Sequence, residues 1–295
     1  FHFNMKIFVT GSNGFTGKYL LPFLSMHGCL VAGGARDSDN QTVYSIDLLD
    51  KNSLVKALTD FQPDVIVHLA GIALPGFTDV ELIYRINMFG TKNLLDAVVE
   101  SGIKLHKFIA ASSAHVYGVV DSLAVSESHI VQPMSHYGNS KLGMENICRL
   151  YMDKLPIIIT RPFNYTGAGQ STDYVLAKIV DHYRRGAKEI TLGNIDVVRD
   201  FSHIEDVLNY YWQLINCKDN GFVVNLCSGA GFSLCEIIEQ MNVIAGYEIN
   251  VNSSNALLRP QDNPVFVGDN SLLMTYMPNH TSMTMLKLLR KMYIS

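Results

Sequence analysis

The sequence has little charge and no long apolar run. Only 17% of its 295 residues are charged, and 23 Lys and Arg against 27 Asp and Glu leave a net charge of −4. Such a chain lacks the basic surface that nucleic-acid binding needs, so we expect no nucleic-acid partner. The longest mostly apolar stretch, residues 65–77, is interrupted by a histidine and two glycines. It is shorter than the roughly 18 residues of a transmembrane helix, so we also expect no membrane partner.

The cysteines and histidines form no redox or metal motif. Five cysteines are present without a CxxC pair, and an odd number cannot all pair within one chain. We therefore expect reduced thiols and a cytoplasmic protein. The ten histidines include no HExxH motif and no Cys/His cluster, so we expect no metal site. Residues 1–4 lack the basic and apolar regions of a signal peptide, and we interpret them as a remnant before a native start at Met5.

What the sequence does contain is a regular alternation of short apolar segments and amphipathic segments. We expect strands at residues 6–10, 29–32, 65–69, 107–111, 157–160 and 222–227. We expect helices at residues 54–61, 87–100, 137–154 and 174–185. This pattern predicts an α/β protein with a doubly wound parallel sheet that helices cover on both faces. The alternation loosens after Arg161, which predicts a smaller, irregular C-terminal lobe with helices near residues 233–245 and 282–292.

A glycine-rich turn follows the first expected strand. Residues 10–17 read TGSNGFTG, with glycines at positions 11, 14 and 17. Gly11 would supply the tight turn, Gly14 the close approach of a phosphate, and Gly17 the contact between helix and sheet. A Walker A loop is excluded, because Ser12 and Tyr19 stand where that motif needs Gly and Ser or Thr. The turn therefore predicts a dinucleotide whose pyrophosphate lies at a helix N-terminus.

The segment after the second strand bears on the choice of cofactor. No acid ends that strand, and Arg36 follows it directly. An arginine there can bind a 2′-phosphate with two hydrogen bonds, which favours NADP(H) over NAD(H). Two alternatives stay open, since Arg36 can be a solvated loop residue and Asp37 can hold the ribose of NAD. Asp47 is placed for an adenine contact after the third strand.

A tyrosine and a lysine are spaced for carbonyl chemistry. Residues 137–141 read YGNSK, which puts Tyr137 and Lys141 one helical turn apart on the same face. A carbonyl reductase needs an acid that protonates the forming alkoxide, and a nearby ammonium lowers the pKa of a phenol. Ser113, at the end of a strand, can hydrogen-bond the substrate oxygen. For Ser112 and Ser113 the alternative is that they cap the strand end.

These motifs occur together and in a fixed order. They are TGxxGFxG, HLAG at 68–71, INMFGTKNLL at 86–95, SSAHVYG at 112–118, YGNSK, RPFN at 161–164 and RDFSHIEDV at 199–207. From Met5 to about Asp206 the chain resembles the extended short-chain dehydrogenase/reductases, in the branch that modifies sugar nucleotides. The resemblance implies a Rossmann-type dinucleotide-binding domain at residues 5–165. It also implies a sugar-nucleotide-binding lobe at residues 166–295, with some segments interleaved.

The resemblance also implies a role for each matching position. Ser113, Tyr137 and Lys141 align with the catalytic triad. The expected cofactor-binding residues are Gly11, Asn13, Gly14, Phe15, Gly17, Arg36, Asp47, Leu48, Leu69, Ala70, Gly71, Asn87, Tyr137 and Lys141. His68 belongs to the same cofactor-lining motif. The expected substrate-binding residues are Ser113, His115, Asn164 and Arg199. Asn87 has the alternative of a helix cap, and Arg199 that of a salt bridge to Asp200 or Asp206.

The reaction expected from the resemblance is a reduction. Sugar-nucleotide 4,6-dehydratases carry an Asp-Glu pair after the catalytic Ser or Thr, where this chain has Ala114 and His115. The chain is similar to reductases of GDP- and dTDP-linked 4-keto-6-deoxyhexoses, and Arg36 suits an exchangeable NADPH. We expect reduction at C4 of such a nucleotide sugar. The alternatives are an NAD-dependent 4-epimerase and a non-catalytic NADP-binding scaffold or sensor. The nucleotide, GDP or dTDP, and the C4 stereochemistry stay open.

Two expected helices also carry apolar residues beyond those that one core face needs. These residues are Phe89, Ile147, Leu150 and Tyr151. In relatives the same helix pair forms a four-helix bundle across a two-fold axis, which implies a homodimer.

Overall fold

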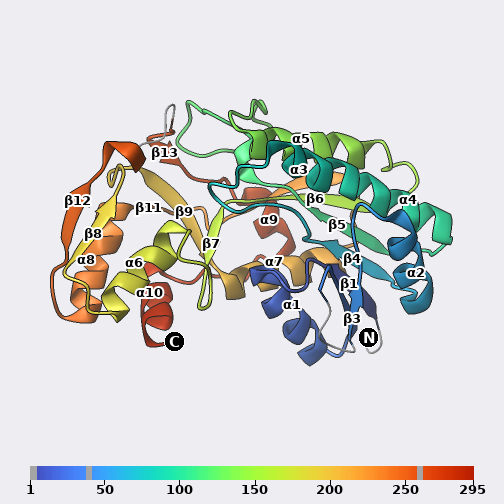
Figure 1. Ribbon diagram of the computed structural model, residues 1–295, viewed down its shortest axis with the longest axis horizontal. Coiled ribbons are helices and arrows are strands. Elements are labelled where there is room, and N and C mark those ends of the chain that lie inside the picture. The colour runs from blue at the N-terminus through green and yellow to red at the C-terminus, as the bar shows by residue number, and fades with distance from the viewer. Residues whose placement is uncertain (1–4, 38–41, 258–261) are drawn as a thin grey trace. The chain divides into compact units, whose positions relative to one another are not determined.

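The computed structural model describes residues 5–37, 42–257 and 262–295 (Figure 1). The remnant expected at residues 1–4 lies outside the described residues. The chain divides into two compact units, each assembled from three segments. The first unit comprises the residues up to Gly118, Ile130–Pro162 and Leu208–Val224. The second comprises Val119–His129, Phe163–Val207 and the residues from Asn225 onward.

A seven-stranded sheet forms the centre of the first unit, in the order β10-β6-β5-β4-β1-β2-β3. Its strands are β1 Lys6–Thr10, β2 Leu30–Ala35, β3 Val43–Ser45, β4 Val65–His68, β5 Lys107–Ala111, β6 Ile157–Pro162 and β10 Phe222–Leu226. The pairs from β3 across to β6 are all parallel. All four residues of β4 are buried, and the first three are apolar without the alternation of a strand that faces solvent on one side.

Helices cover this sheet on both faces (Figure 1). One face carries α2 Lys51–Phe61, α3 Val80–Tyr84, the π-helix η1 Arg85–Gly90, α4 Thr91–Ser101 and α5 His136–Arg149. The other face carries α1 Phe15–Met26 and α7 Ile204–Asn216, whose rings of His27 and Trp212 meet with centroids 4.7 Å apart. The predicted doubly wound parallel sheet is confirmed.

The helix expected at residues 137–154 ends five residues earlier. Helix α5 stops at Arg149, and residues 150–154 form turns instead. There the backbone N–H of Tyr151 donates to Cys148 and that of Lys154 to Tyr151, which are tighter i→i+3 bonds. The apolar residues of this segment follow a helical spacing, but the chain leaves the helix to enter β6.

The strand order reverses beside β1, which fixes where a ligand can bind. The chain continues from β1 to β2 and β3 on one side, whereas β4, β5 and β6 lie on the other. Loops that follow neighbouring strands on opposite sides of such a point diverge and leave a crevice at the carboxyl ends of the strands. The glycine-rich turn after β1 and the segment after β4 both start from this edge of the sheet.

The second unit has smaller sheets and its own core. Strand β9 pairs with β7, β11 and β13, and β8 pairs with β12. The bounds are β7 Asn164–Thr166, β8 Glu189–Leu192, β9 Val198–His203, β11 Gly231–Ser233, β12 Asn250–Ser253 and β13 Val265–Phe266. The helices are α6 Val175–Arg184, α8 Leu234–Ala245, α9 Ser271–Tyr276 and α10 Met285–Ile294. Apolar residues of α6, α8 and α10 form one buried cluster with those of β8.

Three further features concern only the described part of the chain. All five cysteines lie in it, and none forms a disulfide. Across residues 5–37, 42–257 and 262–295, no group of three or more His, Cys, Asp or Glu is placed to hold a metal ion. No helix in these ranges has the length and apolar character needed to cross a membrane.

Candidate active site

The glycine-rich turn follows β1 and leads into α1, as its place in the sequence predicted. Gly11 has φ +71°, a left-handed conformation that favours glycine, and a Cβ there would lie 2.8 Å from the Ala70 nitrogen. A Cβ on Gly17 would lie 2.5 Å from the Gly11 oxygen, so α1 approaches the turn closely. Gly14 is the N-cap of α1, without a side-chain cap and without an acid in the first turn.

This turn fits a dinucleotide diphosphate. A Cβ on Gly14 would meet only the Gly11 oxygen within 4 Å, at 3.1 Å, so the approach to the helix N-terminus is otherwise open. The positive end of the helix dipole faces that opening, and no carboxylate in the first turn competes for it. The residues present therefore suit a negatively charged group at this end of α1.

The residues expected around the adenosine surround the end of β2. The side chain of Asn13 donates to the Asp37 carbonyl over 2.6 Å, which ties the turn to the segment after β2. Arg36 is exposed, and its guanidinium forms no ion pair with any described residue. An Oδ1 of Asp47 accepts from the backbone of Leu49 over 2.8 Å, just before α2.

The two serines after β5 have different partners. The hydroxyl of Ser112 donates to Glu145 Oε1 over 2.6 Å. The oxygen of Ser113 accepts from the His115 backbone over 3.2 Å and caps a short 3-10 helix, η2 Ala114–Val116. Ser113 thus caps the start of η2, whereas the alternative interpretation was that it caps the strand end. A hydroxyl that accepts a hydrogen bond keeps its own proton to donate, so the cap and a bond to a substrate oxygen are compatible.

Tyr137 and Lys141 lie at the start of α5, as their spacing predicted. The Tyr137 ring is half-buried and meets the exposed His115 ring edge-on, with centroids 5.6 Å apart. Lys141 is buried and its Nζ donates to the Ala111 carbonyl over 2.8 Å. Burial lowers the pKa of Lys141 to about 8. Its ammonium is thus held at the end of β5 by a neutral carbonyl, and no carboxylate among the described residues forms an ion pair with it.

Asn87 connects the segment after β4 with α5. Its Oδ1 accepts from the Ile72 backbone over 2.7 Å, and its Nδ2 donates to the Ile72 carbonyl over 3.1 Å. The same Nδ2 donates to Ser140 Oγ over 2.9 Å, and Ser140 donates to the Tyr137 carbonyl over 2.7 Å. Asn87 lies inside a helical segment and caps neither end of it. It is a buried bridge rather than the helix cap that was the alternative.

A buried ion cluster below the site was not predicted from the sequence. The Glu145 carboxylate is bound by Arg161 through Nε at 2.8 Å and a second nitrogen at 2.7 Å, and by Arg149 at 3.0 Å. The Arg161 guanidinium also lies 4.8 Å from the centre of the Tyr117 ring. Burial alone would raise the pKa of Glu145, but the hydrogen bonds and charge of Arg161 hold it below its ordinary value. This cluster fixes Ser112, and with it the end of β5, against α5.

The two residues expected to bind the substrate diphosphate lie in the second unit. Asn164 begins β7, and its Nδ2 donates to the Asp200 carbonyl over 3.2 Å. Arg199 donates to the carbonyls of Val198 and Asn263 and forms an ion pair with Asp262 at 2.6 Å. The alternative of a salt bridge to Asp200 or Asp206 named the wrong partner, because Asp262, at the edge of the described chain, supplies the carboxylate.

The neighbour of Arg199 is a buried carboxylate with neutral partners. Asp200 accepts from the backbone and hydroxyl of Ser228 over 2.9 and 2.7 Å, and from the backbones of Gly229 over 2.9 Å and Gly268 over 3.4 Å. Burial raises the pKa of Asp200 to about 6, against the effect of these hydrogen bonds. In the sequence, Asp200 is marked only by its place in the RDFSHIEDV motif, which does not indicate these partners.

Comparison with known proteins agrees with this architecture. Residues 7–227 match the NAD dependent epimerase/dehydratase family. The chain is similar to GDP-6-deoxy-D-talose 4-dehydrogenase of Aggregatibacter actinomycetemcomitans, at 31% identity over 98% of this chain and 97% of that protein. It is also similar to GDP-6-deoxy-D-mannose reductase of Pseudomonas aeruginosa, at 33% identity over 86% and 84% of the two chains.

A solved structure shows the same fold with a cofactor bound. RMD from Pseudomonas aeruginosa, complexed with NADPH, superposes with a TM-score of 0.86 and 31% identity, over 99% of this chain and 97% of that one. The family match covers the glycine-rich turn, both serines and the Tyr137–Lys141 pair. The resemblance found in the motifs is thereby confirmed, and the chain belongs to the NAD dependent epimerase/dehydratase family, in its sugar-nucleotide branch.

Proposed function

We propose that this protein reduces the C4 keto group of a nucleotide-linked 4-keto-6-deoxyhexose, with NADPH as the reductant. What supports the proposal is the Tyr137–Lys141 pair at the start of α5, together with Ser113 at the N-cap of η2 and with Ala114 and His115 where a dehydratase has Asp and Glu. With a hydride from NADPH, a phenol, an ammonium and a hydroxyl suffice for carbonyl reduction, whereas the carboxyl pair with which a 4,6-dehydratase eliminates water is missing. The names of the two similar relatives, a 4-dehydrogenase and a reductase of GDP-6-deoxyhexoses, support the same chemistry.

Each side chain has one task in the proposed reaction. NADPH would supply the hydride that the C4 carbon accepts. The Ser113 hydroxyl donates a hydrogen bond to the C4 oxygen, without transferring its proton, and polarises the carbonyl. Tyr137 protonates that oxygen as negative charge develops on it. The Lys141 ammonium, oriented by the Ala111 carbonyl, would stabilise the phenolate that Tyr137 becomes as it gives up its proton.

The residues that would hold the cofactor are those at the carboxyl edge of the sheet. The turn from Gly11 to Gly17 would bind the diphosphate, as its open and uncapped helix N-terminus supports. Arg36 would bind the 2′-phosphate, and its lack of an ion pair with a described residue leaves its guanidinium available. Leu69, Ala70 and Gly71 would line the nicotinamide half. These roles favour NADP(H) over NAD(H).

Arg199 and Asn164 would bind the diphosphate of the substrate. One terminal nitrogen of the Arg199 guanidinium already binds Asp262, and the other, Nη1, donates to two backbone carbonyls. A phosphate must therefore compete with Asp262 or share Arg199 with it. Arg199 gives Asp262 one hydrogen bond, which a phosphate oxygen could accept in place of the carboxylate oxygen.

The test is consumption of reduced nicotinamide by the purified protein. NADPH or NADH is paired with GDP-4-keto-6-deoxymannose, dTDP-4-keto-6-deoxyglucose or its 3,5-epimer, and absorbance is followed. We expect stoichiometric oxidation with one of the keto sugars and faster turnover with NADPH than with NADH. Analysis of the product gives the nucleotide and the C4 configuration. If none of the three sugars oxidises either cofactor, the proposal is wrong.

A nucleotide-sugar 4-epimerase is the second candidate, favoured by the family to which residues 7–227 belong. An epimerase would retain NAD, for which Asp37 could hold the ribose. It would interconvert two nucleotide sugars without net oxidation of added cofactor.

A non-catalytic NADP-binding scaffold or sensor would bind cofactor, and no nucleotide sugar would change the fluorescence of the bound NADPH. The presence of Ser113, Tyr137 and Lys141 together argues against this last candidate.

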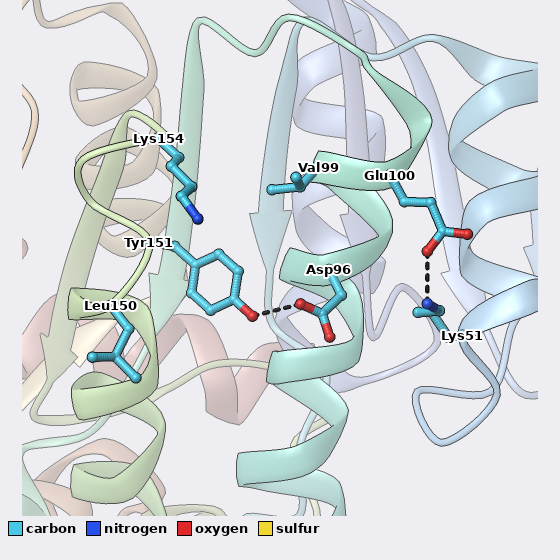
Figure 2. A pocket seen from close by; sticks show the side chains of 7 residues that line it. All are labelled: Lys51, Asp96, Val99, Glu100, Leu150, Tyr151 and Lys154. Carbon is cyan, nitrogen blue, oxygen red and sulfur yellow. Dashed lines mark hydrogen bonds and ion pairs between the residues drawn. The ribbon is translucent and has the colours of Figure 1, made fainter.

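We further propose a cytoplasmic homodimer formed through α4 and α5. Phe89, Val99 and Leu150 are 54%, 47% and 74% exposed on this face of the first unit. Figure 2 shows that Val99 and Leu150 line a pocket with Tyr151, whose hydroxyl points to Asp96 and donates to it over 2.5 Å. Ile147 and Tyr151, also expected to point outward, instead pack against the core. Sedimentation should give a dimer that Leu150→Glu dissociates, whereas a monomeric wild type would contradict the proposal.

A further inference from the structure

Four hydrogen bonds form an unbroken chain through the core of the first unit. The backbone of Ala70 donates to Thr10 Oγ1 over 3.2 Å, and Thr10 Oγ1 lies 2.7 Å from His68 Nδ1. On the other side of the ring, His68 Nε2 lies 2.9 Å from Thr91 Oγ1, which donates to the Asn87 carbonyl over 2.8 Å. The side chains of Thr10, His68 and Thr91 are at most 1% exposed. This chain of hydrogen bonds thus links β1 through β4 to α4, and its three side chains are buried from solvent.

The Asn87 carbonyl at one end and the neutral state of the ring together fix the position of every proton in this chain of hydrogen bonds. A backbone N–H can only donate and a carbonyl can only accept, so Thr91 gives its proton to Asn87 and must receive one from His68 Nε2. Burial, and then the charge of Lys141, lower the pKa of His68 to about 3, so the ring is neutral. Its Nδ1 therefore accepts from Thr10. The opposite tautomer would leave the oxygens of Thr91 and Asn87 facing each other without a proton.

Both ends of the chain hold the same short segment. At one end, Thr10 accepts from Ala70. At the other, the Asn87 side chain binds both the N–H and the carbonyl of Ile72. Gly71 lies between them, and a Cβ there would be 2.9 Å from Asn87 Oδ1 and 3.3 Å from Lys141 Nζ. Residues 70–72 are thus clamped on both sides and rest against the buried ammonium.

The clamp also reaches the catalytic helix. Asn87 donates to Ser140, which donates to the Tyr137 carbonyl. A shift of Asn87 would therefore move the segment 70–72 and the first turn of α5 together. A neutral imidazole has one donor and one acceptor nitrogen, so it can accept from the Thr10 hydroxyl and donate to the Thr91 hydroxyl. A protonated ring has two donors and would leave the Thr10 proton without an acceptor.

We propose that His68, as the neutral Nε2–H tautomer, is a positioning residue that seats residues 70–72 against Lys141 and so prepares the site for the nicotinamide cofactor. This proposal rests on the proposed function only in taking residues 70–72 as part of the cofactor site. His68 acts through Thr10 and Thr91 and does not reach solvent. A buried hydroxyl without a hydrogen-bond partner costs free energy, so these hydrogen bonds keep one direction throughout.

The test combines a tautomer measurement with cofactor binding. In protein labelled with nitrogen-15 histidine, His68 should show a protonated Nε2 and an unprotonated Nδ1, unchanged between about pH 5 and about pH 8. The dissociation constant is then measured by fluorescence, for NADPH or for NADH if that binds more tightly. Thr91→Val removes the relay hydroxyl and should weaken binding about tenfold, whereas Thr91→Ser keeps the hydroxyl and should bind within about twofold of wild type.

A control separates positioning from stability. Leu58→Ala empties a buried site on α2, away from the clamp, and should lower the free energy of unfolding while leaving cofactor binding unchanged. An Nδ1–H tautomer, or equal binding by Thr91→Val and wild type, would overturn the proposal. If Thr91→Val does not fold, the tautomer decides. Cofactor binding that depends on the Thr91 hydroxyl, with no keto sugar reduced, would overturn the proposed function and leave the clamp standing.

Discussion

Glu145 in the first unit and Asp200 in the second are both buried carboxylates next to proposed functional residues, and their surroundings have opposite effects. Glu145 is bound by the guanidinium groups of Arg161 and Arg149. Asp200 receives its hydrogen bonds from backbone N–H groups and a serine hydroxyl, all neutral. The pKa of Glu145 lies below its ordinary value, whereas that of Asp200 is raised to about 6.

The difference shows that hydrogen bonds alone do not offset the burial of a charge. A cation contributes a Coulomb attraction that strengthens as the surroundings become less polar, whereas neutral donors contribute only their dipoles. Lys141 resembles Asp200 in this respect, because its ammonium donates to the neutral Ala111 carbonyl and burial lowers its pKa, which favours the uncharged amine. Buried charged groups with neutral partners, such as Asp200 and Lys141, therefore have pKa values of about 6 and about 8, close to neutral pH.

The largest expected effect on stability comes from removing Arg161, the buried cation that binds Glu145. Arg161→Met leaves Glu145 buried with a single arginine at its edge, and should lower the free energy of unfolding by about 3–5 kcal/mol. Arg149→Met is the matched control, because Arg149 is 39% exposed and its pair is screened by solvent. Its expected loss is below about 1 kcal/mol. Urea denaturation measures both, and equal losses in the two variants would show that Arg161 does not compensate the buried charge.

The second prediction concerns the pH dependence of stability at Asp200. Its folded pKa of about 6 exceeds the ordinary 3.8, so the folded state binds the proton more tightly. The stabilisation by protonated Asp200 is therefore full below pH 3.8 and is lost as pH rises through about 6. Over that window the loss amounts to about 3 kcal/mol.

Asp200→Asn provides the reference for that measurement, since it does not titrate. The difference in free energy of unfolding between wild type and Asp200→Asn should fall as pH rises through this window. For Glu145 the sign is opposite, because its pKa is lowered and its contribution is lost as pH falls below its ordinary value of 4.5. A flat difference at Asp200 would break the contrast between the two carboxylates.

A third, smaller effect is expected in the pH profile of catalysis. The pKa of Lys141 in the protein is about 8, so its ammonium is lost as pH rises through that value. The kcat/KM of the free enzyme should then fall by about tenfold per pH unit above it. In Lys141→Arg the guanidinium stays charged, so the residual activity should not fall in this range. A wild-type profile that stays level well beyond pH 8 would contradict the lowered pKa.

The sequence predicted the parts of the site that depend on short spacing. Tyr137 and Lys141 are one helical turn apart, and the glycines of the turn follow a buried strand, so local geometry determines both. The partners of Glu145, Arg199 and Asp200 could not be predicted in this way. Arg161 lies 16 residues from Glu145 and Asp262 lies 63 residues from Arg199, and only the folded chain brings them together.

The same reason explains why the chain of hydrogen bonds around His68 was missed. Thr10 and Thr91 are 58 and 23 residues from His68, on different elements. The HLAG motif indicated a cofactor-lining segment, and nothing in its letters shows that the histidine faces the core. The end of α5 was misplaced because helical spacing of apolar residues continues to residue 154 although the helix stops at Arg149.

The most direct test of the account pairs turnover with cofactor binding in Tyr137→Phe. This change removes the phenolic proton donor and keeps the ring beside His115. We predict that Tyr137→Phe binds NADPH as the wild type does. With the keto sugar that the wild type reduces, its turnover should be lower by about a hundredfold to ten-thousandfold. Near-normal turnover would contradict the assignment of Tyr137 as the acid, and with it the proposed reduction mechanism.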